Sequence, residues 1–127
     1  MKLSNLPENI KIHTNVERSI KEISILDDKI AGKIIQRITA LGIDSKPDND
    51  ECTSKVVQNL KKYKIGIRRL RCIDIADYRI FYAVRKSGMV CIYALVYAKG
   101  NKHDLVYRQE SAHYNKIKLL SKLWKEC

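Results

Sequence analysis

The sequence predicts an α+β domain in which helices cover one face of an antiparallel sheet. The chain has 127 residues, of which 45% are hydrophobic, and that is enough for one domain with a core of its own. Apolar residues recur at helical spacing in its first third and alternate or run together in its second half. These two periods in that order are typical of α+β proteins.

The first third predicts a strand and then a pair of helices. Residues 10–14 alternate apolar and polar side chains, as a short strand does. Thr14 or Asn15 is expected to cap the helical region that follows. Isoleucines then recur every three or four residues toward Gly42, and Asp27 and Asp28 interrupt the pattern. We therefore expect two helices, or one helix broken at these two residues.

The middle of the chain predicts one loop and one strand. Residues 43–54 are rich in Asp, Asn, Ser and Pro, which favour turns. Residues 55–61 leave the choice between helix and strand open. Residues 64–75 alternate well enough to predict a strand.

The remaining residues predict a hairpin and a C-terminal helix. Residues 78–85 and 89–98 form the two strands, joined by a turn at Ser87-Gly88. Residues 102–126 have the apolar spacing of a helix. The predicted fold is therefore an N-terminal strand and a helical hairpin packed on an antiparallel sheet, followed by a C-terminal helix, in one domain.

Four cysteines are widely spaced along the chain, at Cys52, Cys72, Cys91 and Cys127. No pair has the short spacing of a zinc site, so neither a metal nor another cofactor is expected. We interpret the cysteines as thiols, with Cys127 free at the end of the chain. No apolar stretch could span a membrane, and the N-terminal residues lack the apolar core of a signal peptide. A cytoplasmic protein without a membrane partner is expected.

Positive charge is concentrated in the second part of the chain. The net charge is +11, yet residues 1–50 hold eight Lys or Arg against eight Asp or Glu. All of the excess therefore lies in residues 51–127. Such asymmetry favours a polyanionic partner, either a nucleic acid or an acidic protein. The alternative is a basic surface that only keeps the protein soluble.

Three arginines on neighbouring predicted strands are the candidates for phosphate binding. Arg69 and Arg71 are two residues apart, so a regular strand places them on one face, and Arg79 lies on the next strand. Guanidinium groups on one face form a fork-like receptor for phosphate oxygens. Exposed tyrosines between them would suit base stacking, although for Tyr82, Tyr93 and Tyr97 we favour core packing. The wider set of candidate RNA-binding residues is Lys61, Lys62, Lys64, Arg68 and Lys102.

Part of this pattern resembles the RelE/ParE toxin superfamily. The residues that carry the resemblance are Arg69-Leu70-Arg71, Tyr78-Arg79-Ile80-Phe81-Tyr82, Lys99-Gly100 and Val106-Tyr107. The resemblance covers residues 56–110, and the helical hairpin precedes them as expected in that superfamily.

The resemblance implies a toxin of a type II toxin–antitoxin pair with a microbial-ribonuclease-like sheet. A RelE-type toxin enters the ribosomal decoding site and cuts mRNA there. Its partners would be the ribosome with its RNA, the mRNA and an acidic cognate antitoxin. Cleavage proceeds without a metal, by attack of a 2′-hydroxyl on the adjacent phosphorus, and needs a base, an acid and cations.

Site residues follow from the resemblance position by position. Arg79 matches the phosphate-contacting arginine and Arg71 the arginine of the Leu-Arg pair, whereas Arg69 stands where RelE often has lysine. The chain has a few extra residues between Arg71 and Tyr78. The implied catalytic residues are Arg69, Arg71, Arg79 and Tyr107, with Lys99, Lys102 or His103 as the basic residue upstream of Tyr107.

The general base stays open. Arg69 can clamp phosphate but cannot accept a proton, because a guanidinium stays protonated. The candidates are Lys64, Lys99, His103 and Tyr107; a lysine needs its pKa lowered for this role, whereas a histidine does not. His13 and His113 are interpreted as structural.

Two other functions remain as alternatives. ParE-type toxins share the sheet but inhibit DNA gyrase as protein ligands, without the ribonuclease residues. A non-catalytic RNA-binding module is the third reading, although no common RNA-binding motif is present.

Overall fold

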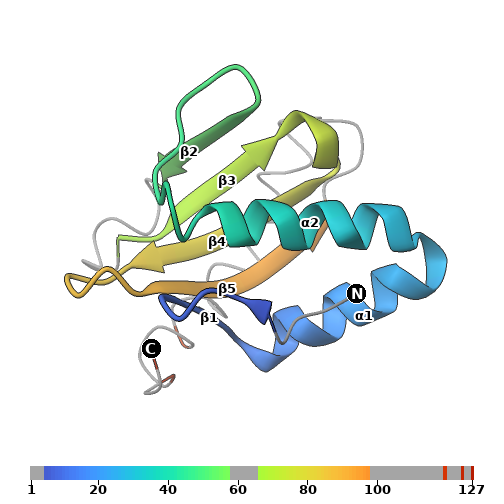
Figure 1. The fold of residues 1–127 in the computed structure, drawn as a ribbon, viewed down its shortest axis with the longest axis horizontal. Coiled ribbons are helices and arrows are strands. Elements are labelled where there is room, and N and C mark those ends of the chain that lie inside the picture. Colours follow the sequence, from blue (N-terminus) through green and yellow to red (C-terminus); the bar gives the residue numbers. More distant parts are fainter. Residues whose placement is uncertain (1–4, 58–65, 98–118, 120–123, 125–126) are drawn as a thin grey trace.

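A computed structural model describes residues 5–57 and 66–97, together with Leu119, Trp124 and Cys127. Two helices cover one face of a five-stranded mixed sheet, so the protein is an α+β structure (Figure 1). The elements in chain order are β1 (Ile10–Ile12), α1 (Thr14–Leu26), α2 (Asp28–Ala40), β2 (Cys52–Val56), β3 (Arg68–Cys72), the 3₁₀ turn η2 (Ile73–Ile75), β4 (Tyr78–Val84) and β5 (Val90–Tyr97).

The sheet differs from the prediction in one strand pairing. Its order is β1-β5-β4-β3-β2. The pairs among β2, β3, β4 and β5 are antiparallel, as expected, but β1 runs parallel to β5. After β1, the two helices carry the chain across the sheet to β2 at its opposite edge. The chain then returns strand by strand to β5, which lies beside β1 and runs in the same direction.

The helix pair is confirmed, with its break at Asp27. This residue ends α1, and its side chain accepts a hydrogen bond from the backbone of Ile30 to begin α2. The cap of α1 is His13, not Thr14 or Asn15 as predicted. The His13 ring accepts a hydrogen bond from the Asn15 backbone N–H at 3.2 Å, which satisfies a donor of the first turn.

Two predicted elements need new boundaries, and a third lies mostly outside the described residues. The predicted loop 43–54 contains the start of β2, because Cys52 is already paired with β3. The predicted strand 64–75 is shorter: β3 ends at Cys72, and η2 follows it. The predicted C-terminal helix at 102–126 lies outside the described residues, apart from Leu119, which is helical, and Trp124, which is not.

The β4–β5 hairpin is confirmed. Gly88 has φ +92° in its turn, a conformation that side-chain-bearing residues rarely adopt. Farther along, the pairing shifts between Phe81 and Tyr82, so β5 carries an extra residue at Tyr93. Such a bulge re-aims a side chain and releases a backbone group. The Tyr93 carbonyl accepts a hydrogen bond from Asn15 Nδ2 at 3.1 Å, which ties β5 to the start of α1.

The main core lies between the helices and the sheet. Every second side chain of the strands points into it, and the inward faces of α1 and α2 complete it. Its largest members include Ile20, Ile34, Ile38, Leu70, Ile80 and Tyr82, each at most 1% exposed. Tyr82 and Tyr93 are buried as predicted, whereas Tyr97 is wrong as a core residue because it is 50% exposed.

The cysteines form two disulfides, so their prediction as thiols is wrong. Cys52 pairs with Cys72 across neighbouring strands, at directly opposed positions of β2 and β3. Cys91 on β5 pairs with Cys127, which was expected to be free. The widely spaced positions in the sequence carry no sign of this pairing, and the strand register brings Cys52 and Cys72 together.

The basic strip, a candidate nucleic-acid interface

The face of the sheet that points away from α1 and α2 carries a row of cations. We call Lys55 on β2, Arg69 and Arg71 on β3, and Arg79 on β4 the basic strip. Lys55 pairs with Arg69, and Arg69 pairs with Phe81, two residues from Arg79. Directly opposed residues, and residues two apart on one strand, share a face of a sheet. The register therefore brings all four side chains to one face, as alternation predicts for Arg69 and Arg71.

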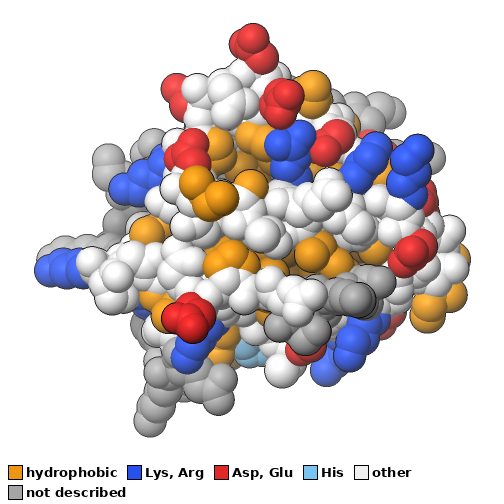
Figure 2. Space-filling view, viewed as in Figure 1, with side chains coloured by type: hydrophobic (Ala, Val, Ile, Leu, Met, Phe, Trp, Pro, Cys, Tyr) orange, Lys and Arg blue, Asp and Glu red, His pale blue; other side chains and the backbone are white. Residues whose placement is uncertain are grey.

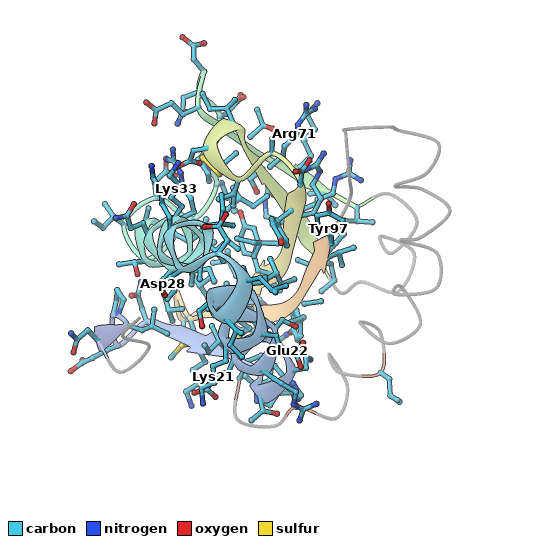
Figure 3. All side chains as sticks on the ribbon, turned by 90° about the vertical axis from the view of Figure 1, so that its right-hand side faces the viewer. Lys21, Glu22, Asp28, Lys33, Arg71 and Tyr97 are labelled. Atoms are coloured by element: carbon cyan, nitrogen blue, oxygen red, sulfur yellow. A yellow bond between two sulfur atoms is a disulfide. The ribbon has the colours of Figure 1, made fainter. Side chains whose placement is uncertain are left out.

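The side chains of the basic strip become less exposed from β2 toward β4. Lys55 and Arg71 are exposed, Arg69 is half-buried, and Arg79 is only 4% exposed. Figure 3 shows Arg71 on the side of the sheet away from Lys33 and α2. Within the strip, Lys55 and Arg71 are therefore the cations most accessible to a polyanion in solution.

Arg79 has a structural role that the sequence does not reveal. Its Nη1 donates hydrogen bonds to the carbonyls of Ala76, at 2.5 Å, and Tyr78, at 3.0 Å. These bonds fasten the turn after η2 to the first residues of β4. A buried charge needs such partners, because losing water costs it several kcal/mol. Arg79 therefore contributes positive potential to the face while its Nη1 is engaged with the backbone.

Arg68 does not belong to this face, although the sequence groups it with its neighbours. Its Nε donates to Ser54 Oγ at 2.8 Å, and its Nη2 donates to the Ser54 carbonyl at 3.1 Å. Ser54 Oγ also bonds the hydroxyl of Tyr82, which donates to the Ser45 carbonyl at 2.6 Å. Burial raises the pKa of Tyr82 above its ordinary value. This network anchors the segment before β2 on the helix-covered side.

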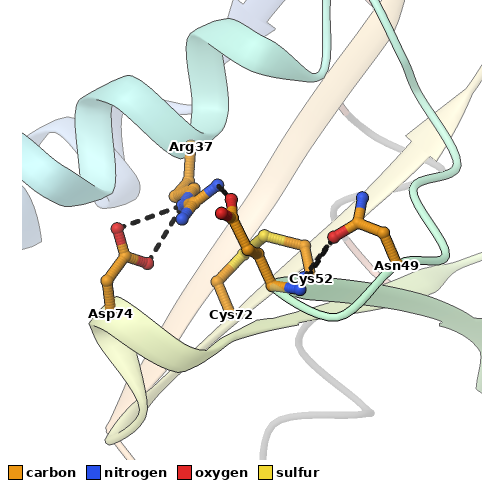
Figure 4. Close-up of polar contacts among 6 residues, drawn as sticks. Arg37, Asn49, Cys52, Cys72 and Asp74 are labelled. Atoms are coloured by element: carbon orange, nitrogen blue, oxygen red, sulfur yellow. Dashed lines mark hydrogen bonds and ion pairs between the residues drawn. A yellow bond between two sulfur atoms is a disulfide. The ribbon is translucent and has the colours of Figure 1, made fainter.

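Acidic side chains gather at one end of the molecule, over the segment before β2 (Figure 2). Two of the nearby carboxylates are engaged by Arg37 of α2. Its Nε donates to Asp74 at 3.0 and 3.2 Å, and its Nη1 lies 3.5 Å from Glu51 (Figure 4). The hydrogen bond to Asp74 raises the pKa of Arg37. Glu51 and Arg71 line the same open cavity of about 170 Å³.

An aromatic pair lies at the same end of the sheet as Arg79. The rings of Tyr78 and Tyr97 are 5.2 Å apart and tilted by 58°. The two residues face each other at the start of β4 and the end of β5. Burial raises the pKa of Tyr78, whereas the ring of Tyr97 is half exposed. By the same register, Tyr97 lies on the helix-covered face with Tyr78 and Ile80, and not on the face of the basic strip.

Many of the predicted site residues lie outside the described residues. They are Lys61, Lys62, Lys64, Lys99, Lys102, His103 and Tyr107. The segments outside the described ranges hold eleven Lys or Arg against three Asp or Glu, so most of the net charge of +11 belongs to them. The described strip thus represents only part of the charge that the sequence analysis assigns to a polyanionic partner.

One residue of the strip escapes the sequence analysis. Lys55 falls in the stretch for which neither helix nor strand was favoured. Its signal is the alternation of Thr53 and Lys55 with Ser54 and Val56, which is weak because only Val56 is strongly apolar.

Of the two histidines interpreted as structural, His13 is described. It caps α1, which confirms a structural role.

The basic strip can bind phosphate, but it supplies no base through its arginines. In the described part of the chain, no group of three or more His, Cys, Asp or Glu side chains could hold a metal ion. None of the described helices is long and apolar enough to cross a membrane. Comparison with family models, curated proteins and solved structures finds no match to the chain.

Proposed function

We propose that this protein is a RelE-like toxin of a type II toxin–antitoxin pair, a ribosome-dependent mRNA endoribonuclease. The observation that carries the proposal is the basic strip, which lies on the sheet face opposite the helices. The order of a strand, two helices and an antiparallel run of strands supports it. So does the fact that β3 and β4 carry the Leu-Arg and Tyr-Arg pairs of the resemblance.

In this proposal the strip holds the mRNA backbone. Arg71 and Lys55 contact phosphate oxygens first because they are exposed. Arg69 and the buried Arg79 add positive potential that stabilises the extra negative charge on phosphorus in the transition state. An acidic antitoxin would cover the same surface and prevent it from binding RNA.

The chemistry proposed is an internal transfer at one phosphate. The 2′-hydroxyl loses its proton to a base and attacks the adjacent phosphorus, while the 5′-oxygen of the next nucleotide leaves with a proton from an acid. The products are a 2′,3′-cyclic phosphate and a 5′-hydroxyl. The arginines of the strip cannot be the base, so the base comes from Lys64, Lys99, His103 or Tyr107.

A reconstituted translation reaction tests the proposal. We expect new mRNA ends, mapped by primer extension, only when ribosomes are translating. Arg71→Glu should abolish most of the cleavage, whereas Lys29→Glu, the same charge change on exposed α2, should leave it intact. Replacing Arg71 with Ala should also lower the slope of log affinity for RNA against log salt by about one. Intact mRNA in the presence of folded protein would contradict the proposal.

A ParE-like inhibitor of DNA gyrase is the second candidate. The observation that favours it is the burial of Arg79, which withdraws one guanidinium from direct contact with phosphate. If the translation reaction leaves mRNA intact, the same preparation should be added to a gyrase supercoiling reaction. Inhibition there, unaffected by Arg71→Glu, would favour this function.

A further inference from the structure

The end of the chain is fastened to the second face of the sheet. Cys127 is bonded to Cys91, which is fully buried on β5. Trp124 packs edge-on against two rings, with centroid distances of 5.6 Å to Tyr93 and 5.2 Å to His13. Figure 1 places the C-terminus beside β1 and the start of β5. Trp124 and Cys127 thus pack on the part of this face that β5 forms, beside the basic strip.

An aromatic ring and a guanidinium lie at this closed place. Tyr93 is 0% exposed, and its hydroxyl accepts a hydrogen bond from Arg85 Nη2 at 2.9 Å. Arg85 Nε is buried without a hydrogen-bond partner in the structure. A buried donor without a partner is unfavourable. In the closed arrangement Arg85 Nε therefore lacks a hydrogen bond. A phosphate oxygen would accept that hydrogen bond if the face were open.

The two disulfides differ in what else holds their ends together. Cys52 and Cys72 face each other in the β2–β3 ladder, whose backbone hydrogen bonds keep the strands together without the disulfide. Cys91 and Cys127 are 36 residues apart. Among the described residues, the contacts that hold the chain end besides the bond are the ring contacts of Trp124 and its packing beside Cys127 on the apolar residues of this face.

We propose that the Cys91–Cys127 disulfide is a redox-sensitive clamp, and that its reduction moves Trp124 away and opens Tyr93 and Arg85 to polyanions. The reductant is a dithiol: its two thiols give up two electrons and two protons and become a disulfide, while the S–S bond breaks into two cysteine thiols. Disulfides persist in oxidising compartments and are reduced in reducing ones. The benefit for RNA binding rests on the proposed function, whereas the opening itself does not.

Trp124 is the sole tryptophan of the sequence, so its fluorescence reports on the clamp directly. On adding dithiothreitol to the oxidised protein, we expect the emission to shift to longer wavelength and acrylamide to quench it more strongly. Cys127→Ser should show the shifted emission without reductant and should not respond to it, although its Cys52–Cys72 bond is intact. Equal emission from the oxidised protein and Cys127→Ser would overturn the clamp.

Binding of a short polyuridine RNA then tests what the opening does. Cys127→Ser should bind roughly tenfold more tightly than the oxidised protein, the gain expected from one stacked base and one cation. Adding Arg85→Gln to Cys127→Ser should remove part of the gain. Equal affinity despite a shifted tryptophan would overturn the regulatory part of the proposal. A clamp that opens in a protein that never cuts mRNA would refute the proposed function instead and leave the clamp standing.

Discussion

The two faces of the sheet are made by the same strands but are finished in different ways. The face under the helices is closed by apolar residues of α1 and α2, such as Ile20 and Ile34, which have no exposed surface. The other face combines buried aromatic residues, such as Phe81 and Tyr93, with the cations of the basic strip. The cations of the basic strip are not needed to close this face, and their placement on one side supports the proposal that a polyanion binds there.

The largest effect should come from the helix-covered face. Replacing Ile34 with Ala deletes a fully buried side chain and should lower the free energy of unfolding by about 3 kcal/mol. Urea denaturation measures this loss, and the folded fraction should keep its RNA affinity. Ile25→Ala is the control, because Ile25 is 83% exposed, and it should change stability little. A lower RNA affinity of folded Ile34→Ala would show that the faces are not separate.

A smaller stability effect should come from the buried cation of the basic strip. Arg79→Ala leaves the carbonyls of Ala76 and Tyr78 without their donor and should cost about 2 kcal/mol of stability. Arg71→Ala should cost almost nothing in the same denaturation experiment, because Arg71 is exposed. Equal losses from the two variants would contradict the graded burial of the strip.

The smallest effect is a loss of stability at alkaline pH, to which one buried tyrosine on each face should contribute. Burial raises the pKa of Tyr82 on one face and of Tyr93 on the other. Below the ordinary tyrosine pKa of 10.0 both folded and unfolded chains hold these protons. Above it the unfolded chain ionises first, so stability should fall as pH rises toward the folded-state values.

Two variants measure how much Tyr82 and Tyr93 each contribute to this decline in stability. Tyr82→Phe should lose about 1 kcal/mol at neutral pH, because Ser45 and Ser54 lose a partner, yet its stability should decline less above pH 10. Tyr93→Phe should flatten the decline in the same way. Denaturation midpoints at several alkaline pH values give the comparison. Slopes identical to that of the unchanged protein would show that neither tyrosine resists ionisation.

Local patterns in the sequence predicted most of the helix-covered face. The helical period and the interruption at Asp27 located both helices, and the glycine turn located the β4–β5 hairpin. β2 was missed because Cys52–Val56 is an edge strand with one strongly apolar residue. The parallel pairing of β1 with β5 joins distant segments, so no local pattern could report it.

Local sequence patterns also predicted part of the basic strip. Alternation alone places Arg69 and Arg71 on one face, whereas the face of Arg79 depends on the register of β3 with β4. It cannot show that Arg79 is buried or that Arg68 turns to Ser54, because both facts depend on which residues from other strands and turns lie nearby. The cysteines were misread because the expected cytoplasmic setting argued against disulfides, and this expectation had no structural basis.

The parallel pairing of β1 with β5 bears on when the protein can fold during its own synthesis. Residues 10–12 emerge from the ribosome long before their partners at residues 90–92. Until then α1 and α2 have only part of the sheet to cover, and Asn15 lacks the Tyr93 carbonyl that it bonds. A chain released early, before residue 90, therefore cannot complete its sheet. Completion of the described sheet is therefore delayed until residues 90–97 have left the ribosome, because its first described strand pairs with its last described strand.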